Sequence, residues 1–332
     1  MFLANLGYNG RVNIVIKIGV GLEVFLLKHV VSVSLGSSRR DHTVRVELLG
    51  EKFKISRMGT DGDFNRALEV LRELDGKVDA IGLGGIDVYL FVRRKRYTIR
   101  DGLKLMEAVK VTPVVDGSGL KNTLEREVVR ILAEKTGLLK RGMRVLMVSS
   151  LDRFGMAEAL SDMGCDMTFG DLIFTMGMTY PVRTVAELEE IAGRTLPELV
   201  KMPFHMLYPT GKKQESQDEA KVKQFAHYYH DAEVIAGDYH LIRRFMPDGM
   251  DRRIILTNTT TREDIDFLRE KGVGTLVTTT PEFEGRSFGT NVIEAAMVAI
   301  LGKLPEQITP ADYLDLLDKL DFQPRVLNLE NR

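Results

Sequence analysis

The chain of 332 residues has very little cysteine, no excess of charge of either sign and no long apolar run. Its one cysteine, Cys165, excludes a disulfide within the chain and favours a reducing, cytoplasmic environment. Lysine plus arginine number 46 against 47 for aspartate plus glutamate, so the chain lacks the basic field that nucleic acid attracts. We therefore expect a cytoplasmic protein with neither nucleic acid nor membrane as its partner.

The N-terminal segment 13–27, NIVIKIGVGLEVFLL, is apolar but is interrupted by two charged residues. It is too short to span a bilayer, and no small-residue cleavage site follows it. Glu23 and Val24 are what a ribosome-binding sequence encodes when it is translated, and Leu27 fits a TTG start codon. We therefore expect residues 1–27 to be a non-native or disordered extension without a functional site.

The chain as a whole has the composition of an ordinary globular protein, with 44% hydrophobic and 28% charged residues. Short apolar strands at 233–236, 253–256 and 275–277 alternate with helices at 239–245, 262–270 and 291–301, which indicates an α/β fold. We predict two domains, of which the C-terminal one is a doubly wound, Rossmann-like parallel sheet. The expected divisions are an α/β substrate domain at 28–140, the Rossmann-like domain at 141–305, and a C-terminal helix and tail at 306–332.

The segment 144–171 has the layout of the first half of a dinucleotide-binding βαβ unit. Residues 145–148 are an unbroken apolar run, as a strand covered on both faces requires. Gly155 opens the following helix. Asp171 lies about 20 residues beyond the turn, where such folds place the acid that binds a ribose hydroxyl.

The turn of this unit departs from the glycine fingerprint, because Ser150, Asp152 and Gly155 occupy the three glycine positions. Asp152 places a carboxylate near the expected phosphate unless Arg153 offsets it. The unit therefore predicts NAD or NADP, with Asp171 favouring NAD because a carboxylate repels a 2′-phosphate. The alternative is an α/β unit that binds another molecule, or none, at this turn.

Polar residues follow nearly every strand of the second domain, where ligands bind in open parallel sheets. The alternative is that they only cap the helices that follow. The predicted cofactor-binding set is Ser149, Ser150, Asp152, Arg153, Gly155, Asp171, Thr257, Asn258 and Thr278.

In the first domain, a strand leads into Gly117-Ser118-Gly119 and then into Lys121 at a helix start. Backbone donors at a helix N-terminus and a lysine suit an anion. Asp116 is close enough in sequence to pair with Lys121, so we predict these two residues as a catalytic proton relay. The alternative is a capped helix with a surface salt bridge.

A second polar turn follows the first strand of this domain. Its hydroxyl and guanidinium groups suit a carboxylate or phosphate, although the turn also fits a solvated hairpin loop. The predicted substrate-binding residues are Ser37, Ser38, Arg39, Arg40 and Asn122.

Two further features have weaker functional implications. The basic loop 208–214, YPTGKKQ, suits a lid over a ligand or an exposed connector. His227 and His230 share a helix face but lack the spacing of a zinc motif, so we expect no metal.

The motifs VSVSLGSSRRDH, GLGGIDVYL, TPVVDGSGLKNTLERE and EGRSFGTNVIEA together resemble bacterial proteins labelled quinate 5-dehydrogenase. The resemblance covers residues 28–301. It implies oxidation of a cyclic polyol acid by a nicotinamide cofactor held in a C-terminal domain. The NVTxPxK and GxGGxx patterns of shikimate dehydrogenases are absent, and Lys121 is the lysine that loosely matches the first of them.

We therefore predict an NAD(P)-dependent oxidoreductase that acts on a small anionic hydroxy acid of the quinate or shikimate type, in a chain that allows a homodimer. One alternative is an enzyme for a phosphorylated or nucleotide-linked ligand, with anion sites at 119–121, 212–213 and 286–290. The other is a non-catalytic small-molecule sensor that uses the same cleft.

Overall fold

The computed structural model describes residues 4–6, 12–14, 27–207, 217, 219–280, 282–283, 286–287 and 289–330. Strands β1 (Ala4–Leu6) and β2 (Val12–Ile14) pair antiparallel near the N-terminus. Most of the predicted extension 1–27 lies outside the described residues, as do the predicted lid 208–214 and its lysine pair 212–213.

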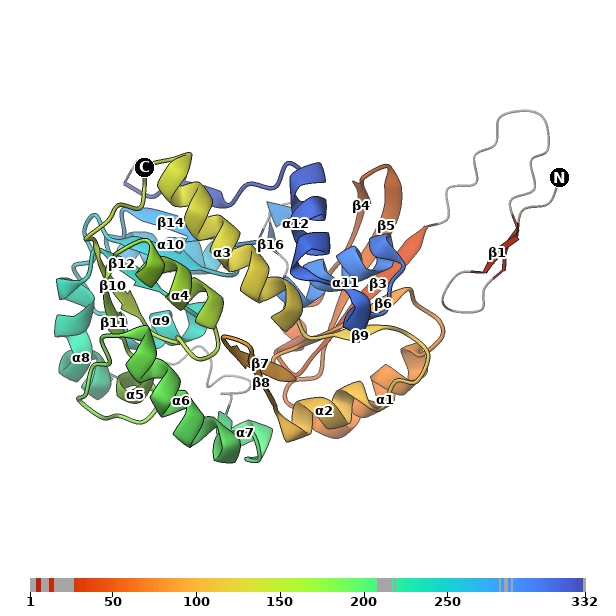
Figure 1. The fold of residues 1–332 in the computed structure, drawn as a ribbon, viewed down its shortest axis with the longest axis horizontal. Coiled ribbons are helices and arrows are strands. Elements are labelled where there is room, and N and C mark those ends of the chain that lie inside the picture. Colours follow the sequence, from red (N-terminus) through yellow and green to blue (C-terminus); the bar gives the residue numbers. More distant parts are fainter. Residues whose placement is uncertain are drawn as a thin grey trace.

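The described chain from residue 27 onward folds into two α/β lobes, as the sequence predicts (Figure 1). In the five-stranded sheet of the N-terminal lobe, β4 pairs antiparallel with β5, and the other neighbouring strands pair in parallel. The sheet order is β4 (Thr43–Leu48), β5 (Glu51–Gly59), β3 (Lys28–Ser34), β6 (Ala80–Gly84) and β9 (Val114–Val115). The other elements of this lobe are the 3₁₀ turn η1 (Ser38–Arg40), α1 (Phe64–Leu74), the hairpin β7 (Tyr89–Val92) with β8 (Lys95–Thr98), and α2 (Arg100–Met106).

The sheet of the C-terminal lobe has its parallel strands at the centre and one antiparallel strand, β17, at its edge. Its order is β11 (Asp166–Phe169), β10 (Arg144–Met147), β12 (Val234–Ala236), β13 (Ile254–Thr257), β14 (Thr275–Thr278) and β17 (Arg325–Asn328). Its helices are α4 (Phe154–Asp162), α5 (Asp171–Phe174), α6 (Val185–Leu199), α7 (Phe204–Leu207), α8 (Glu219–Asp231), α9 (Tyr239–Phe245) and α10 (Arg262–Glu270). The order reverses direction at β10, which is the topology of a doubly wound sheet.

The chain passes between the lobes at several points. Helix α3 (Ser118–Glu134) leaves the N-terminal sheet and packs on α4. Helix α11 (Thr290–Leu301) follows C-terminal strands but packs on β3 and β6 of the N-terminal sheet, whereas the sequence places it in the domain 141–305. The chain then forms η3 (Pro305–Gln307) and α12 (Pro310–Lys319), which packs on α3, before β17 returns to the C-terminal sheet. The short strands β15 (Glu282–Phe283) and β16 (Arg286–Ser287) precede α11.

Because of these crossings, the apolar core runs continuously through both lobes. Val30 and Phe53 of the N-terminal sheet belong to the same buried cluster as Val145 of the C-terminal sheet, with Leu124 of α3 among them. Within the described residues, no helix is both long and apolar enough to cross a membrane.

Candidate functional site

The turns that follow the strands of both lobes meet at the junction of the lobes. Arg40 follows β3 in the N-terminal lobe, and its Nη1 lies 3.4 Å from Nε2 of His240, on α9 of the other lobe. The carboxyl ends of strands in open parallel sheets are where ligands bind. The junction therefore combines the ligand-binding edges of both sheets.

A group of charged side chains fills this junction, and we call it the inter-lobe cluster. Its centre is Lys121, in the first turn of α3, whose Nζ lies 2.8 Å from Oδ1 of Asp152 and 3.1 Å from Oδ1 of Asp87. Asp87 belongs to the N-terminal lobe and Asp152 to the turn after β10. Lys121 thus ties both lobes to the helix that crosses between them. The cluster consists of Asp87, Lys121, Glu125, Asp152, Arg153 and Asp238.

Burial and mutual attraction set the protonation of the central three groups. Burial lowers the pKa of Lys121, but the carboxylates of Asp152 and Asp87 outweigh this effect and raise it above its ordinary value. Burial raises the pKa of Asp87 to about 7, with Lys121 acting in the opposite direction. For Asp152, burial is outweighed by Lys121 and Arg153, which hold its pKa well below the usual range. At neutral pH the cluster therefore contains a charged lysine and a charged Asp152.

Arg153 forms the second half of the cluster and is 3% exposed. Its Nη1 pairs with Glu125, which is 1% exposed, and its Nη2 lies 3.7 Å from Oδ2 of Asp238. Among the described residues, Nε of Arg153 and Oε2 of Glu125 have no hydrogen-bond partner. Nε of Arg153 can therefore donate a further hydrogen bond, and Oε2 of Glu125 can accept one.

Little space remains beside the cluster in this conformation. The cavity next to Lys121 and Arg153 has a volume of about 10 Å³ and is also bordered by Tyr89 and Phe91. That volume holds about one water molecule. The lobes must therefore separate before a larger molecule reaches the cluster.

The predicted relay between Lys121 and Asp116 is not formed. Oδ2 of Asp116 accepts hydrogen bonds from the backbone N–H groups of Val88 (2.6 Å) and Tyr89 (2.9 Å), and Oδ1 accepts from the hydroxyl of Ser118 (2.6 Å). Asp116 therefore organises the backbone around it, whereas Asp87 and Asp152 bind Lys121.

The anion site predicted at the start of α3 is filled by the protein itself. The backbone N–H of Leu120 donates to Oε1 of Glu294 on α11 (3.2 Å), and that of Ser118 donates to Asp116 (3.0 Å). Two internal carboxylates thus take the donors that a bound phosphate requires.

The fingerprint predicts that Asp171 binds a ribose hydroxyl, but its carboxyl group bonds to the backbone of the protein itself. Its Oδ1 accepts hydrogen bonds from the backbone N–H groups of Ser150 (2.9 Å) and Leu151 (3.0 Å). Burial raises the pKa of Asp171, although these bonds act in the opposite direction. Because a pyrophosphate needs those backbone donors, an internal carboxylate occupies the position predicted for the cofactor.

Gly155 serves helix packing rather than close approach to a phosphate. A Cβ on Gly155 would lie 2.5 Å from Oδ1 and 2.7 Å from the carbonyl oxygen of Asn122. Gly155 and Asn122, predicted as cofactor-binding and substrate-binding residues, therefore form the contact between α4 and α3, at the edge of the small cavity.

The remaining predicted cofactor residues bond mainly to the turns of neighbouring strands. The Ser149 hydroxyl oxygen accepts from the backbone N–H of Asp238 (2.9 Å). The Thr257 hydroxyl donates to the carbonyl of Gly237 (2.8 Å), and Asn258 accepts from Thr257 (3.1 Å). Thr278 is fully buried. Of the predicted cofactor set, only Asp152 and Arg153 belong to the inter-lobe cluster.

In the predicted substrate turn, Arg40 alone has a hydrogen-bond contact with the other lobe among the described residues. Ser38 bonds through its backbone N–H and its hydroxyl to Asp61, and Ser37 caps the turn by accepting from the backbone N–H of Arg39. Arg39 is exposed. The serines therefore stabilise the turn rather than forming a pocket.

The predicted site residues do not include Asp87, Glu125, Asp238 or His240. Asp87 and Asp238 follow strands in Gly-containing turns, which is a weak but usable signal. Glu125 lies four residues after Lys121 on α3, so helical periodicity places it on the same face. His240 is found only from the three-dimensional contact with Arg40.

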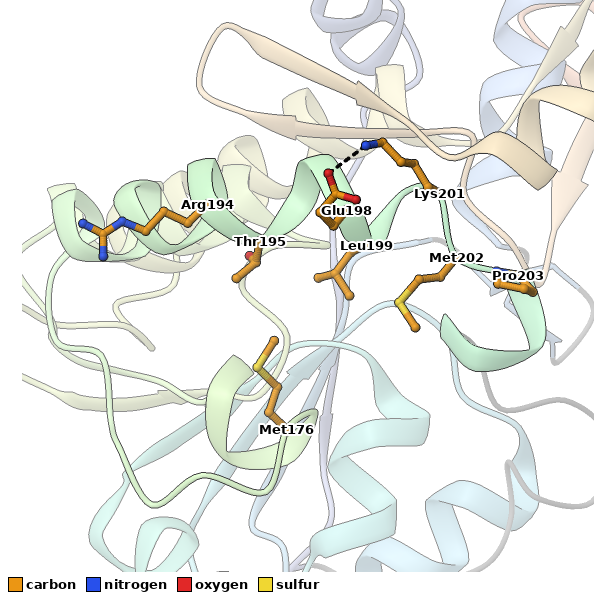
Figure 2. Close-up of a pocket in the computed structure, with 8 residues that line it drawn as sticks. All are labelled: Met176, Arg194, Thr195, Glu198, Leu199, Lys201, Met202 and Pro203. Carbon is orange, nitrogen blue, oxygen red and sulfur yellow. Dashed lines mark hydrogen bonds and ion pairs between the residues drawn. The ribbon is translucent and has the colours of Figure 1, made fainter.

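A separate surface groove lies along the C-terminal part of α6 and the residues that follow it (Figure 2). Its volume is about 590 Å³. Glu198 and Lys201 at its edge form an ion pair of 2.7 Å. The groove is lined by Met176, Arg194, Thr195, Glu198, Leu199, Lys201, Met202 and Pro203, none of which belongs to the inter-lobe cluster. Among the described residues, no three His, Cys, Asp or Glu side chains are grouped so that they could hold a metal ion.

These features define a two-lobed α/β protein with a buried charged cluster between its lobes. The chain belongs to the family described as Domain of unknown function (DUF8754), whose model matches residues 119–329. Residues 29–116 match a second family model, Domain of unknown function (DUF8753). The curated proteins contain no match.

Several solved structures are similar over most of the chain, at low identity. GanP, a glucose-galactose binding protein from Geobacillus stearothermophilus, is 13% identical and has a TM-score of 0.39, with 92% of this chain and 99% of that chain covered. A periplasmic ribose ABC transporter from Conexibacter woesei is 10% identical, with a TM-score of 0.36 and coverage of 91% and 92%. A periplasmic sugar-binding protein from Pseudomonas fluorescens is 12% identical, with a TM-score of 0.37 and coverage of 91% and 87%.

The predicted membership of the quinate 5-dehydrogenase family is wrong. The chain belongs instead to the family whose model matches residues 119–329, and that model and the one matching residues 29–116 describe domains of unknown function. The prediction of an NAD(P)-dependent oxidoreductase is wrong with it. The geometry explains the error, because Asp171 and Gly155 satisfy the fingerprint positions for structural reasons. Binding of NAD or NADP and cytoplasmic localisation stay predictions.

Proposed function

We propose that this protein binds a small polar molecule at the inter-lobe cluster without transforming it. The observation that carries the proposal is that Lys121 of the crossing helix bonds both Asp87 of one lobe and Asp152 of the other. A molecule that replaces one of these bonds contacts both lobes at once. This is the non-catalytic alternative that the sequence leaves open.

The protonation of Lys121 argues against its predicted role as a proton relay. An effective general base or acid needs a pKa near the working pH. The carboxylates around Lys121 raise its pKa above the ordinary value, against the effect of burial, so it keeps its proton at neutral pH. Lys121 is therefore suited to donating hydrogen bonds and unsuited to relaying protons.

The charges of the cluster favour a neutral, hydroxylated ligand over an anion. The carboxyl groups of Asp87, Glu125, Asp152 and Asp238 outnumber the cations Lys121 and Arg153. Even with Asp87 partly protonated near neutral pH, the cluster has no net positive charge that would attract a phosphate or carboxylate. Hydroxyl groups both donate and accept hydrogen bonds, so they suit a site that offers carboxylates and cationic donors together.

A thermal-shift screen followed by calorimetry tests the proposal. The panel contains neutral sugars and polyols, the hydroxy acids quinate and shikimate, inorganic phosphate and NAD⁺. A neutral polyol should stabilise the protein, by about 2.7 kcal/mol at a concentration 100-fold above its Kd. No turnover should accompany binding.

Two variants locate the binding. Asp238 caps α9 by accepting from the backbone N–H groups of His240 and Leu241, and asparagine is an equally good cap, so Asp238→Asn should fold. It should weaken binding at least tenfold. Asp63→Asn is the matched control, because Asp63 caps α1 outside the cluster. Equal binding by both variants, or binding of anions alone, would overturn the proposal.

A further inference from the structure

The segment after α6 belongs to the C-terminal part of the chain but bonds to the N-terminal lobe. The backbone N–H of Arg100 donates to the carbonyl of Val200 (2.9 Å), and the backbone N–H of Phe204 donates to Oδ2 of Asp101 (3.0 Å). Arg100 and Asp101 are the first two residues of α2. Residues 200–204 therefore dock on the N-terminus of a helix in the other lobe.

Helix α2 depends on this segment for its capping. Its N-cap residue, Ile99, makes no side-chain capping bond. A helix N-terminus leaves backbone donors without intrahelical partners, and the Val200 carbonyl satisfies one of them. Asp101 is 7% exposed. Burial raises the pKa of Asp101, but Lys104 and the bond from Phe204 outweigh that effect and lower it overall.

An aromatic contact reinforces these polar bonds. The ring of Phe204 stacks on that of Phe64 in α1, with centroids 5.5 Å apart and planes 26° apart. Phe204 also packs against the buried apolar cluster under α1. Met206 on the same short helix is 61% exposed instead. Phe204 is thus the apolar anchor of the segment.

This docking site lies across the molecule from the crossing helices. Figure 1 shows α7 beside α2 and α1 in the lower part of the view, whereas α3 and α12 run along the upper part. The lobes are thus joined on one side by crossing helices and on the other by residues 200–204. An opening about the crossing helices must break the contacts of residues 200–204.

The docked helix is in direct contact with the inter-lobe cluster. A Cβ on Gly102 of α2 would lie 2.5 Å from the carbonyl oxygen of Asp87, so the helix packs on the backbone of that residue. The backbone N–H of Ile99 also donates to the carbonyl of Val88 (2.8 Å). A displacement of α2 therefore moves Asp87, which bonds Lys121.

We infer that residues 200–204 form a latch that holds the two lobes closed over the inter-lobe cluster, and that its release admits the ligand. That release of the latch admits a ligand rests on the proposed function. That the latch holds the lobes together does not, because it concerns only the distance between the lobes. Release separates Phe204 from Phe64 and exchanges the Val200 and Asp101 bonds for bonds to water. The crossing helices keep the lobes connected meanwhile.

Distance measurements between the lobes, made without any ligand, test the latch. Spin labels are attached at Arg72→Cys on α1 and Gln224→Cys on α8, both exposed positions, in a Cys165→Ser background. Pulsed electron resonance then gives the distribution of distances between the lobes. Phe204→Ala and Asp101→Ala should each add a population at longer distance that the parent lacks.

Met206→Ala is the matched control, since it removes an apolar side chain of the same helix that points to solvent. It should keep the parent distribution. Circular dichroism confirms that each variant is folded, and a combined Phe64→Ala/Phe204→Ala variant should open no further than Phe204→Ala alone, because both substitutions break one contact. Parent-like distances in folded Phe204→Ala and Asp101→Ala would overturn the latch, even if a polyol binds. If the thermal-shift screen finds no ligand, the proposed function is overturned, but the result of the distance measurements still stands.

Discussion

The carboxyl group of Glu294 connects distant parts of the chain and makes stability depend on pH. It is 3% exposed, and its Oε1 also accepts a hydrogen bond from the hydroxyl of Tyr313 (2.6 Å). Burial, together with the charge of Asp116, raises the pKa of Glu294 to about 7. The folded protein thus holds a proton that the unfolded chain releases near pH 4.5.

Because the pKa is raised in the folded state, the free energy of unfolding should decrease as the pH rises. Protonated Glu294 contributes its full stability below the unfolded pKa, and the contribution is lost as the pH rises toward 7. Glu294→Gln removes the titrating group, so the variant should gain on the parent by up to about 1.4 kcal/mol per pH unit across this window. Urea unfolding at pH 5, 6 and 7 measures the difference, and parallel curves would contradict it.

Two helical glycines, Gly155 and Gly193, differ in the space that an added methyl group would find. Gly155 of α4 contacts Asn122 of α3 so closely that a Cβ would overlap the backbone carbonyl, at 2.7 Å. Gly155→Ala should therefore cost about 1–3 kcal/mol of unfolding free energy, through overpacking. Gly193 lies inside α6, and a Cβ added there would meet no heavy atom within 4 Å apart from its chain neighbours and the nearby backbone of its own helix.

Gly193→Ala should accordingly stabilise the protein by about 0.5–1 kcal/mol, because alanine restricts the unfolded chain and favours helix. Thermal or urea unfolding of both variants gives the comparison. A loss of equal size in the two variants would show that the α3–α4 contact is not the cause.

Helices with local signals were predicted almost to the residue. The predicted helix 262–270 is α10, because Thr261 and Asp264 form a capping box that the sequence itself encodes. Strand β8, KRYT, was missed because its charged residues hide the alternation of a hairpin. Strand β17 was missed because it depends on pairing with β14, about 50 residues earlier, which no local pattern reports.

The site was less predictable than the elements, for the same reason. Lys121 was assigned to Asp116, its neighbour in sequence, but its partners are 34 and 31 residues away at Asp87 and Asp152. Local spacing could mark each acid as a turn residue. Which acid reaches Lys121 depends on how two sheets are placed against one helix.

The whole molecule should unfold as one unit, although two family models divide it at residues 116 and 119. Helices α3 and α11 lie in the second segment, yet α11 covers β3 and β6 of the first. A fragment of residues 27–116 thus exposes an apolar sheet face, and we expect it to be unfolded by circular dichroism.

Co-expression with residues 117–332 should restore folding of the fragment, and the two pieces should purify together. Calorimetry of the intact chain should give a single transition. Cooperative melting of the isolated fragment, or two separate transitions in the intact chain, would contradict this view of the fold.

The late position of α11 in the chain also has a consequence during synthesis. The strands of the N-terminal sheet are complete by Val115, but the helix that covers β3 and β6 ends at Leu301. At about 5–20 residues per second, the ribosome needs roughly 10–40 s to make the intervening stretch. Throughout that time the nascent chain presents an uncovered apolar face, which makes it a client for chaperones that bind at the ribosomal exit.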